Sequence, residues 1–596
     1  MIATENSRRR GGFSLILGGL WLLVSGGLIW SGWAEITTLS GWDPDDALRL
    51  VQLRDFLDGQ SWFDSTQYRM NPPGGAPMHW SRLVELPLAL IILLLRPMLG
   101  QPVAEMIAGT AIPLLLLCWI AFMLSRIAER MSGREAGIAA AMITLSSGAL
   151  LFQLRPMRID HHGWQLAMAV LALSTIFWPN ARKAGLMLGM ALALWLHISL
   201  EGAPMTAAFF LLLGFRWVRS AGEGERLFWT ILSFACCAFL LFFGTQASGL
   251  AAAIYCDTIS PPHVAAIAIA ASVMLPAIRL LPDDQRLRLC AAALGGAGAL
   301  AVIFLLAPQC AGGAFGTLNP LVHEYWYVKV TEGLPIWHQP WRIAVSLGAG
   351  LACGAISWII LRVRLAREDR QKLSTIGFFL IFGLVLSILI IRTISVATAF
   401  AIPVTAALIA SLFEQYRQSQ TPWTRIGLVM AMLALLVPGA IASSIIRSVP
   451  SEAAQKEESA AMANELCQSA LSIRALSALP EGSFIAPFDM GPMILAQTPH
   501  KVLASSHHRN EQAMYDHIQI FRSPPTSAWR LLQARGINYL AACDGEAELH
   551  FYATKNPDGL WAQLMSDNGP DWLEPMPDRG KGIKVWRVRK TGFSPE

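Results

Sequence analysis

The chain has 596 residues, of which 54% are hydrophobic and only 15% are charged, and its mean hydropathy is +0.45. A soluble protein of ordinary composition carries about 25% charged residues, so this composition excludes a soluble globular enzyme and indicates a membrane protein. The net charge of +5 comes from basic residues scattered over short loops, and we therefore expect no nucleic-acid partner.

Thirteen apolar runs are long enough to be membrane-spanning helices. A span takes about 20 residues, and somewhat shorter spans occur. The predicted spans are 12–34, 102–125, 136–154, 164–178, 185–200, 203–217, 227–246, 262–281, 288–307, 343–363, 374–391, 395–413 and 425–446. This pattern predicts a polytopic α-helical membrane protein with about thirteen transmembrane helices.

The distribution of arginine and lysine predicts the orientation. Arg8, Arg9 and Arg10 precede the first span, and no convincing cleavage site follows it, so we interpret it as an anchor rather than a signal peptide. The later basic loops fall on alternate connections. By the positive-inside rule, the N-terminus is then cytoplasmic and the C-terminus lies outside.

One apolar run, 86–95, is too short for a confident span and lies between Arg82 and Arg96. A run of about 10–14 residues is more often interfacial than spanning. Counting it as a span would also reverse the side of the basic loop that follows the next span. We predict an interfacial or re-entrant helix.

The composition changes after residue 446, where the predicted spans end. The remaining segment is charged, contains turn signals, and at about 150 residues can bury its own core. We predict a soluble α/β domain with a helix over 453–479 and strands over 484–487, 502–505, 539–542 and 583–588. The chain then divides into a membrane domain, 1–446, with outer loops 35–101, 155–163 and 308–342, and an outer domain, 447–596.

The cysteines suggest packing more than metal chemistry. Five lie within predicted spans: Cys118, Cys236, Cys237, Cys290 and Cys353. Cys467 and Cys543 both lie in the outer domain, where an oxidising compartment would permit a disulfide, and the sequence leaves their pairing open. No Cys-x-x-Cys motif occurs, so a thiolate zinc site is not expected.

The first outer loop carries an acidic cluster, Asp43-Pro44-Asp45-Asp46. Proline disfavours the helical conformation for the residue before it and suits the first turn of a helix. Asp43 is therefore expected in an extended conformation at the start of a helix. The alternative to a functional role is a helix cap with solvated acids, which the isolated motif favours.

The second cluster, Asp160-His161-His162, lies between two closely spaced spans. A carboxylate and imidazoles at a membrane boundary need partners. Carboxylate oxygen with imidazole nitrogen suits Mn²⁺ or Mg²⁺, and zinc remains open. The alternative is a salt link from Asp160 to Arg155 or Arg158.

The third cluster lies in the long outer loop 308–342, where Glu332 has Glu324 nearby. Connections of this length are uncommon and often functional. Trp326 and Trp337 are also explained as interfacial anchors, but that reading leaves Glu332 unexplained.

These motifs together resemble those of the catalytic subunit of oligosaccharyltransferase, a metal-dependent GT-C glycosyltransferase with thirteen spans and an outer soluble domain. That family's first loop carries Asp-Pro, four residues and then Arg, which segment 43–49 matches. Its second motif in archaeal members is Asp-His-His, matched at 160–162, and its fifth-loop Thr-Ile-x-Glu motif resembles 329–332. The motifs occur in the family's order along the whole chain.

The resemblance implies roles for individual residues. The implied metal ligands are Asp43, Asp160 and His162. The implied catalytic set, which includes groups that orient the acceptor, is Asp43, Glu332 and Asp45. The implied contacts to the donor phosphate are Arg392, Arg49 and Arg158, since guanidinium groups pair with phosphate oxygens bidentately. An interfacial arginine extending into water explains Arg392 equally well.

The chain departs from the family at the acceptor motif Trp-Trp-Asp-Tyr-Gly, where it has 487–491, Pro-Phe-Asp-Met-Gly. Asp489 is retained and both tryptophans are absent, which puts recognition of Asn-x-Ser/Thr in doubt. Asp489, Glu332, His507 and His508 are the expected acceptor-binding residues, with a solvated loop as the alternative for the two histidines.

The resemblance thus implies a membrane glycosyltransferase of a bacterial or archaeal cytoplasmic (inner) membrane, with a periplasmic C-terminal domain. It would move a sugar or oligosaccharide from a polyprenyl-(pyro)phosphate donor to a protein, polysaccharide or lipid acceptor, with inversion, and a single-subunit enzyme is consistent with it. The alternative is a transporter or flippase of lipid-linked sugars. Transporters commonly show inverted repeats, which this sequence lacks, and His197 with Glu201 is the nearest candidate for a transport pair.

Overall fold

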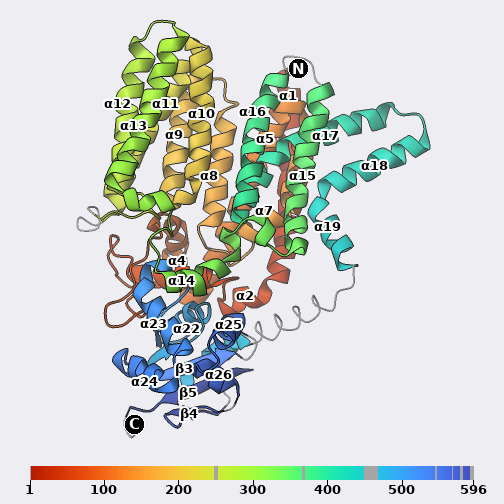
Figure 1. Cartoon of the computed structure of the whole chain (residues 1–596). Coiled ribbons are helices and arrows are strands. Elements are labelled where there is room, and N and C mark those ends of the chain that lie inside the picture. The colour runs from red at the N-terminus through yellow and green to blue at the C-terminus, as the bar shows by residue number, and fades with distance from the viewer. Residues whose placement is uncertain are drawn as a thin grey trace.

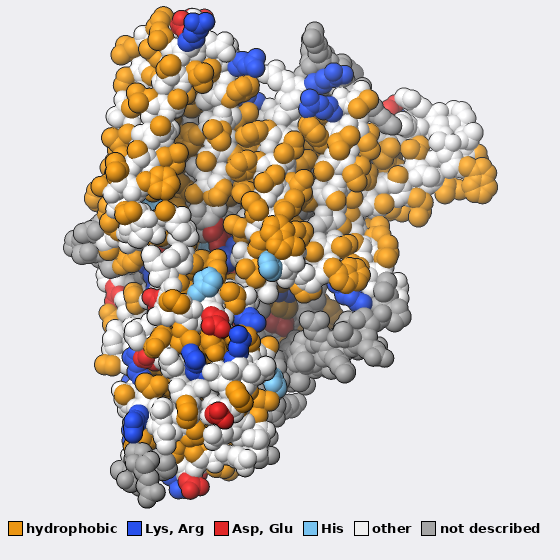
Figure 2. Space-filling model, in the orientation of Figure 1, with side chains coloured by type: hydrophobic (Ala, Val, Ile, Leu, Met, Phe, Trp, Pro, Cys, Tyr) orange, Lys and Arg blue, Asp and Glu red, His pale blue; other side chains and the backbone are white. Residues whose placement is uncertain are grey.

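The computed structural model describes residues 2–246, 253–364, 369–448, 467–543, 546–566, 568–577 and 582–590. A bundle of long helices stands above a smaller α/β domain, and α1 runs from the far end of the bundle toward that domain (Figure 1). Hydrophobic side chains cover the visible face of the bundle, and charged ones gather at its upper end and on the α/β domain (Figure 2).

Most of the bundle helices follow one another with short connections, and long segments separate α1 from α5 and α13 from α15. They are α1 (Ile2–Ser31), α5 (Gln101–Ser132), α6 (Arg134–Ser146), α7 (Gly148–Leu154), α8 (His162–Thr175), α9 (Ala181–Ile198), α10 (Ala203–Arg219), α11 (Gly224–Thr245), α12 (Pro261–Leu280), α13 (Gln285–Leu306), α15 (Trp341–Arg364), α16 (Asp369–Leu389), α17 (Ile394–Gln418), α18 (Pro422–Leu436) and α19 (Pro438–Arg447).

Every predicted span coincides with one of these helices or with a bent pair. By length and composition, eight helices can cross a membrane, or ten if the bent pairs α6–α7 (63°) and α18–α19 (89°) each form one span. The other three predicted spans are α8, α9 and α10, with 14, 18 and 17 residues, so this criterion supports fewer than thirteen. The run 86–95 lies in α4 (Leu86–Leu99), whose 14 residues are too few to span.

Helix α17 is the most buried candidate span, because small residues let its neighbours approach closely. In its 18-residue apolar stretch, 72% of the residues are buried. The helix packs against α5, α6, α8, α15 and α16. A Cβ added to Gly354 of α15 would lie 2.3 Å from that of Ala401, so the two backbones meet where neither carries a large side chain. Small residues at helix interfaces are the usual basis of packing in membranes.

The α/β domain contains a five-stranded sheet in the order β2-β1-β3-β5-β4. β1 pairs in parallel with β2 and β3, and β5 runs antiparallel to β3 and β4. The strands are β1 (Ser483–Ile485), β2 (Lys501–Val502), β3 (Tyr539–Cys543), β4 (Leu573–Pro575) and β5 (Ile583–Val588). The helices are α21 (Ala470–Arg474), α22 (Met490–Gln497), α23 (Glu511–Arg522), α24 (Pro525–Ala534), α25 (Ala547–Lys555) and α26 (Leu560–Met565).

The four strands predicted from sequence overlap β1, β2, β3 and β5, and β4 is an addition. β4 escaped prediction because its three residues, Leu-Glu-Pro, include a proline and show no alternation. Most of the helix predicted over 453–479 lies outside the described residues, and the described part contains α21 and a 3₁₀ turn, Ala475–Ala478.

Outer segments of the membrane domain complete the two cores of the α/β domain. From the first outer loop, α3 (Pro44–Leu57) packs on α22 and contributes Leu48 and Val51 to one core, together with Trp80. α14 (Pro320–Tyr325) contributes Val322 and Tyr325 to the other. The membrane domain and the α/β domain therefore hold each other in place, with the acidic loops between them.

Two disulfides occur among the described residues. Cys467–Cys543 joins the segment before α21 to β3, which confirms the pairing that the sequence left open. Cys256–Cys310, which sequence reasoning missed, joins the segment before α12 to the 3₁₀ turn Pro308–Gly312 after α13.

Removing the Cys467–Cys543 bond should destabilise the α/β domain. The bond closes a loop with a sequence separation of 76 residues, so its loss should cost about 2–5 kcal/mol through greater freedom of the unfolded chain. The paired variant Cys467→Ala/Cys543→Ala should melt several degrees lower than the wild type. Cys118→Ala, which removes a free cysteine of α5, is the control, and equal melting temperatures for the paired variant and the wild type would contradict the assignment.

Candidate functional site

The start of α3 is fixed by a capping interaction that the Asp-Pro motif predicts. Asp43 has extended backbone (φ −150°), and its Oδ1 accepts a hydrogen bond from the Asp46 N–H at 3.0 Å, with Pro44 following at the first helical position. Asp43 Oδ2 forms an ion pair with Arg158. The helix-cap reading is thus confirmed for Asp43, and its carboxylate also reaches the second acidic loop.

Asp46 joins the two loops. Its side chain is fully buried and accepts hydrogen bonds from the backbone N–H groups of Trp42, Ile159 and Asp160 at 3.0, 2.9 and 3.1 Å. Arg158 Nη1 donates to it at 3.0 Å. Burying a carboxylate requires such partners, so Asp46 fixes the position of the second loop relative to α3.

The second loop forms a compact cluster of possible metal ligands. Ligand atoms of Asp160, His161 and His162 all lie within 4.8 Å of one another. Asp160 Oδ1 is hydrogen-bonded to His161 Nδ1, and its Oδ2 lies 3.4 Å from His162 Nε2. The predicted alternative, a salt link from Asp160 to Arg155 or Arg158, is not found among the described residues, since Arg158 pairs with Asp43 and Arg155 stacks on the Trp42 ring.

This cluster fits a divalent cation. Asp160 Oδ2 is buried and has no hydrogen-bond partner among the described residues, which is unusual for a carboxylate oxygen. Burial alone would raise the pKa of Asp160, but His161, His162 and Arg158 outweigh it and hold that pKa well below its usual range. The oxygen is therefore charged and available, in a set of oxygen and nitrogen donors that suits a divalent metal. Asp43 lies outside the cluster because Arg158 holds it.

Asp45 and Arg49, two further predicted site residues, lie beside this cluster. Burial, followed by the charges of Asp160 and Glu332, raises the pKa of Asp45 well above its usual value. Arg49 is fully buried, donates to Glu85 at 3.1 Å, and lies 3.9 Å from Asp160 Oδ1 through its Nη2. Its Nε and Nη2 have no hydrogen-bond partner among the described residues. Asp45 is thus a protonatable group at the site, and Arg49 has one donor, Nη2, close to Asp160.

The predicted phosphate contact Arg392 lies between two carboxylates from different segments. It belongs to the 3₁₀ turn Ile391–Thr393 before α17 and forms ion pairs with Glu201, in the turn between α9 and α10, and with Glu332 Oε1 at 3.3 Å. The Ile391 N–H donates to the Leu334 carbonyl at 3.2 Å, which holds the outer loop against this turn. Glu332 and Arg392, predicted for acceptor and donor, are thus brought together.

Glu201 links Arg392 to the histidine cluster. Gln165 Nε2 donates to Glu201 Oε2 at 3.1 Å and lies 3.4 Å from His162 Nδ1, while Trp195 Nε1 donates to Gln165 Oε1 at 3.2 Å. Burial would raise the pKa of Glu201, but Arg392 and the two histidines lower it to about 2. His162, Gln165, Glu201 and Arg392 line one pocket.

The pair proposed for a transporter does not form. His197 Nδ1 is hydrogen-bonded to the Ala193 carbonyl of its own helix at 2.9 Å, and Glu201 takes Arg392 and Gln165 as partners. The two side chains therefore belong to separate interactions.

Asp489 of the departing acceptor motif lies just before α22, near Glu548 and Glu332. Burial, with these two charges, raises its pKa to about 6. The adjacent Phe488 stacks on His517, with ring centroids 4.1 Å apart. A Cβ added at Gly491 would lie 2.6 Å from the Ala504 carbonyl oxygen, so the retained glycine is explained by close backbone approach.

The acidic group around Asp489 predicts a pH dependence of stability. Burial, then Glu548 and Asp489, raises the pKa of Glu546 to about 7 from an ordinary 4.5. The folded state then holds a proton that the unfolded state has lost, so this stabilisation is full below pH 4.5 and disappears as the pH rises through 7. Glu546→Gln should therefore stabilise the protein at pH 8 by about 1–3 kcal/mol and leave its melting temperature at low pH unchanged.

Thermal unfolding between pH 4 and 8 would check this. Asp571→Asn, at an exposed position of the same domain, is the control and should follow the wild-type profile. Parallel profiles for Glu546→Gln and the wild type would contradict the assignment.

His507 and His508, expected to contact the acceptor, lie in a different group of side chains. His508 Nε2 is 2.7 Å from Asp257 Oδ2, and the His507 ring lies near those of His79 and Trp80. Trp80 also faces His161, at 6.4 Å between ring centroids, so the two groups are neighbours across this indole.

Sequence reasoning thus selected residues that the structure brings to two neighbouring groups, the Asp160 cluster with its surroundings and the group of His507 and His508, and missed several of their partners. The missed residues are Asp46, Glu85, Gln165, Glu201 as a partner of Arg392, Asp257 and Glu548. Asp46 carried a signal, since it belongs to the first acidic cluster. Gln165 lies three residues after His162 on the same helix, a spacing that places both side chains on one face.

Comparison with known proteins gives the fold. No protein-family model and no curated protein sequence matches the chain. Among solved structures it is similar to the archaeal oligosaccharyltransferase AglB from Archaeoglobus fulgidus in complex with an inhibitory peptide and a dolichol-phosphate. The TM-score is 0.67 at 12% identity, covering 97% of this chain and 75% of that one.

Two further structures of the Archaeoglobus fulgidus oligosaccharyltransferase are also similar. One is tethered to an acceptor peptide containing the NVT sequon, with a TM-score of 0.59 at 11% identity, covering 96% of this chain and 74% of that one. The other is a complex with Zn and sulfate, with a TM-score of 0.58 at 12% identity, covering 96% and 73%. The chain has the GT-C fold of the archaeal oligosaccharyltransferase, as its motifs predicted.

Proposed function

We propose that this protein is a membrane glycosyltransferase that moves a sugar or oligosaccharide from a polyprenyl-(pyro)phosphate donor to an acceptor outside the cytoplasm. The observation that carries the proposal is the Asp160–His161–His162 cluster, whose buried carboxylate oxygen has no hydrogen-bond partner among the residues described and lies on the same network as Arg392 and Glu332. The shared fold supports it, because the similar enzyme was solved with dolichol-phosphate, with peptides and with Zn.

The metal would be held by Asp160 and His162 with His161, and Mn²⁺ or Mg²⁺ suits this donor set. A divalent ion there would neutralise the negative charge that builds on the leaving phosphate. Asp43 and Arg158 neutralise each other in the structure, so their proposed roles as metal ligand and phosphate contact are linked. Each can take up its role only when the pair opens.

Arg392 would bind donor phosphate oxygens in competition with its two carboxylate partners. A guanidinium group fits phosphate through two parallel hydrogen bonds. Phosphate binding would leave Glu332 free to accept a hydrogen bond from the attacking group, with Asp45 close by. Arg49, directed at Asp160, would add positive charge at the same place. A single attack on the anomeric carbon would invert its configuration.

The acceptor is proposed to differ from an asparagine sequon. Phe488 and Pro487 stand where the resemblance expects two tryptophans, and Phe488 stacks on His517 rather than presenting an open aromatic surface. A polysaccharide, a lipid or another secreted protein group therefore fits better, with Asp489 as a hydrogen-bond acceptor.

The test uses the purified full chain with lipid-linked glycans extracted from its host, in Mn²⁺ or in EDTA. Mass spectrometry would follow loss of the donor, release of polyprenyl phosphate or pyrophosphate, and the glycosylated product. Metal-dependent release supports the proposal. Glycosylation of an Asn-x-Thr peptide would overturn the acceptor preference alone, whereas movement of intact donor across proteoliposomes without its consumption would favour a flippase.

A further inference from the structure

A second group of possible ligands lies on the other side of Trp80 from the Asp160 cluster. Its members are His79 of the first outer loop, Asp257 of the segment between α11 and α12, and His508 of the α/β domain. Their ligand atoms lie within 4.8 Å of one another. His508 Nε2 and His79 Nδ1 are 2.7 and 3.7 Å from the same oxygen, Asp257 Oδ2.

A third imidazole completes the group. The ring of His507 lies 4.9 Å from that of His79 and 5.4 Å from that of His508, between centroids. His507 is only 4% exposed, and neither of its ring nitrogens has a hydrogen-bond partner among the described residues. The Nδ1 of His79 also has none. Buried imidazoles without partners are uncommon and call for an explanation.

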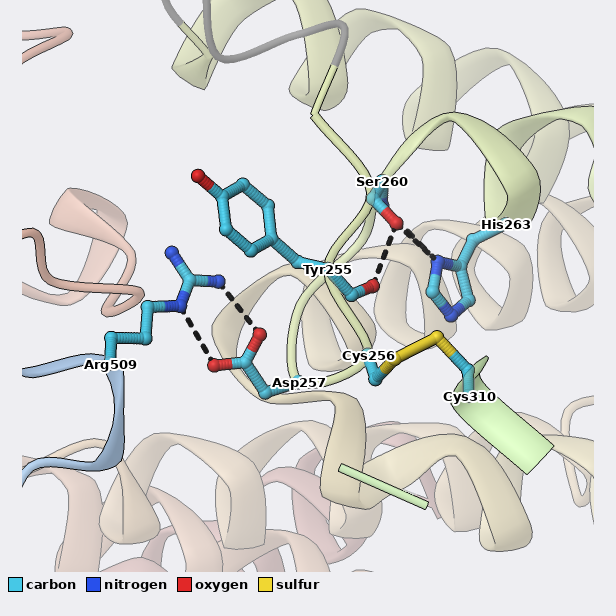
Figure 3. Close-up of a disulfide and its surroundings, with 7 residues drawn as sticks. All are labelled: Tyr255, Cys256, Asp257, Ser260, His263, Cys310 and Arg509. Atoms are coloured by element: carbon cyan, nitrogen blue, oxygen red, sulfur yellow. Dashed lines mark hydrogen bonds and ion pairs between the residues drawn. A yellow bond between two sulfur atoms is a disulfide. The ribbon is translucent and has the colours of Figure 1, made fainter. Parts of the chain in front are cut away.

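The charges here favour a cation over an anion. The ring nitrogens of His507 and the Nδ1 of His79 make no hydrogen bond among the described residues, so their lone pairs can be offered to a cation. Arg509 does not offer its charge to an anion, because it is paired with Asp257 through Nε at 2.9 Å and Nη2 at 2.7 Å (Figure 3). A carboxylate keeps further lone pairs after accepting these bonds, and such partners orient ligating carboxylates in metal sites.

The position of Asp257 is fixed by its neighbours in sequence. Cys256, the residue before Asp257, forms a disulfide with Cys310 (Figure 3). Ser260, three residues after Asp257, caps α12 together with His263. Tyr255, two residues before Asp257, packs against Arg509, whose guanidinium carbon lies 3.9 Å from the centroid of the tyrosine ring. The carboxylate is thus presented by a rigid segment, as a preorganised ligand requires.

We propose that His79, Asp257 and His508, with His507 as a fourth donor, bind a divalent transition metal, preferably Zn²⁺. Three imidazoles and one carboxylate form a donor set typical of zinc and unlike the oxygen-rich sets of Mg²⁺. The ligands come from three separate parts of the chain, so the ion would fasten the first outer loop and the α11–α12 segment to the α/β domain. This site is independent of the proposed transferase chemistry.

Zinc binding by the metal-stripped full chain would test this, with Zn²⁺ alone as the probe. The measurements are made in an Asp160→Asn/His162→Ala background, so that zinc at the first cluster does not contribute. Calorimetry with elemental analysis should give one Zn²⁺ per chain in this background. Adding His508→Ala or Asp257→Asn should abolish binding or weaken it at least about 100-fold, whereas adding His338→Ala, at an exposed histidine, should leave it unchanged.

Melting temperatures without zinc would show whether each variant folds, and His508→Gln serves as a second, milder variant. Zinc should raise the melting temperature of the background protein and not that of the His508 variants. X-ray absorption should show imidazole nitrogen around the ion. Unchanged zinc binding in His508→Ala and Asp257→Asn would overturn the proposal, as would binding of inorganic phosphate in place of zinc. None of these readouts depends on donor turnover, so failure here is distinct from failure of the transferase assay.

Discussion

Asp160→Asn should reduce release of polyprenyl phosphate from the donor about 10³-fold. The substitution removes the carboxylate of the cluster, whose Oδ2 is buried and has no hydrogen-bond partner in the described part of the chain, and replaces it with an amide that binds a divalent ion poorly. Loss of an electrostatic group aimed at developing charge costs about 10²–10³ in turnover, and loss of a metal adds to this. The measurement is the initial rate of donor turnover over a series of Mn²⁺ concentrations.

The shape of the metal dependence separates metal binding from structural damage. Asp160→Asn should need much more Mn²⁺ for half-maximal rate, whereas a merely misfolded protein would lose rate without that shift. Asp58→Asn, which changes an exposed carboxylate at the end of α3, is the matched control and should behave as wild type. Turnover by Asp160→Asn at the wild-type rate in EDTA would remove the cluster from the mechanism.

Arg392→Gln should lower kcat/KM for the donor about 10²-fold or more. The arginine forms ion pairs with Glu201 and Glu332, and its loss would remove a phosphate contact and leave two neighbouring carboxylates uncompensated. Arg392→Lys should recover only part of the activity, because an ammonium group is a single point of charge and lacks the planar pair of donors. Kinetics with varied donor concentration would show the larger effect in KM if binding is the main role.

Arg417→Gln is a control that removes the same kind of charge. Arg417 is exposed at the end of α17, and its Nη1 lies 4.0 Å from the Glu414 carboxylate. This substitution should leave kcat/KM and the melting temperature unchanged. If Arg392→Gln lost stability and kept its kinetics for the folded fraction, Arg392 would be a structural link and not a phosphate contact.

The local parts of the site could be predicted from sequence because their signals are local. The Asp-Pro motif requires an extended residue before a helix, and the structure has Asp43 in that conformation, capping α3. Asp160 and its two histidines are adjacent in sequence, so any turn there brings their ligand atoms together. The alternation of strand β5 likewise predicted its bounds, 583–588, correctly.

The partners of these residues could not be predicted, since they depend on how distant segments pack. Arg392 meets Glu201 across 191 positions, and Arg158 meets Asp46 across 112. Neither pairing produces a periodicity or a spacing in the sequence. The Cys256–Cys310 disulfide could have been predicted as a possibility, because both residues lie just beyond predicted spans on the same predicted side of the membrane. Two cysteines on the same predicted outer side can form a disulfide, as Cys467 and Cys543 can.

We propose that this protein consumes a lipid-linked sugar at the Asp160 cluster. The most direct test incubates purified wild-type protein with lipid-linked glycans of its host, removes divalent metal with EDTA, and then restores Mn²⁺. We predict release of polyprenyl phosphate or pyrophosphate by the wild type that stops in EDTA and returns with Mn²⁺, and release by Asp160→Asn that stays about 10³-fold slower at the same Mn²⁺ concentration. Release that continues unchanged in EDTA and in Asp160→Asn would contradict this proposal.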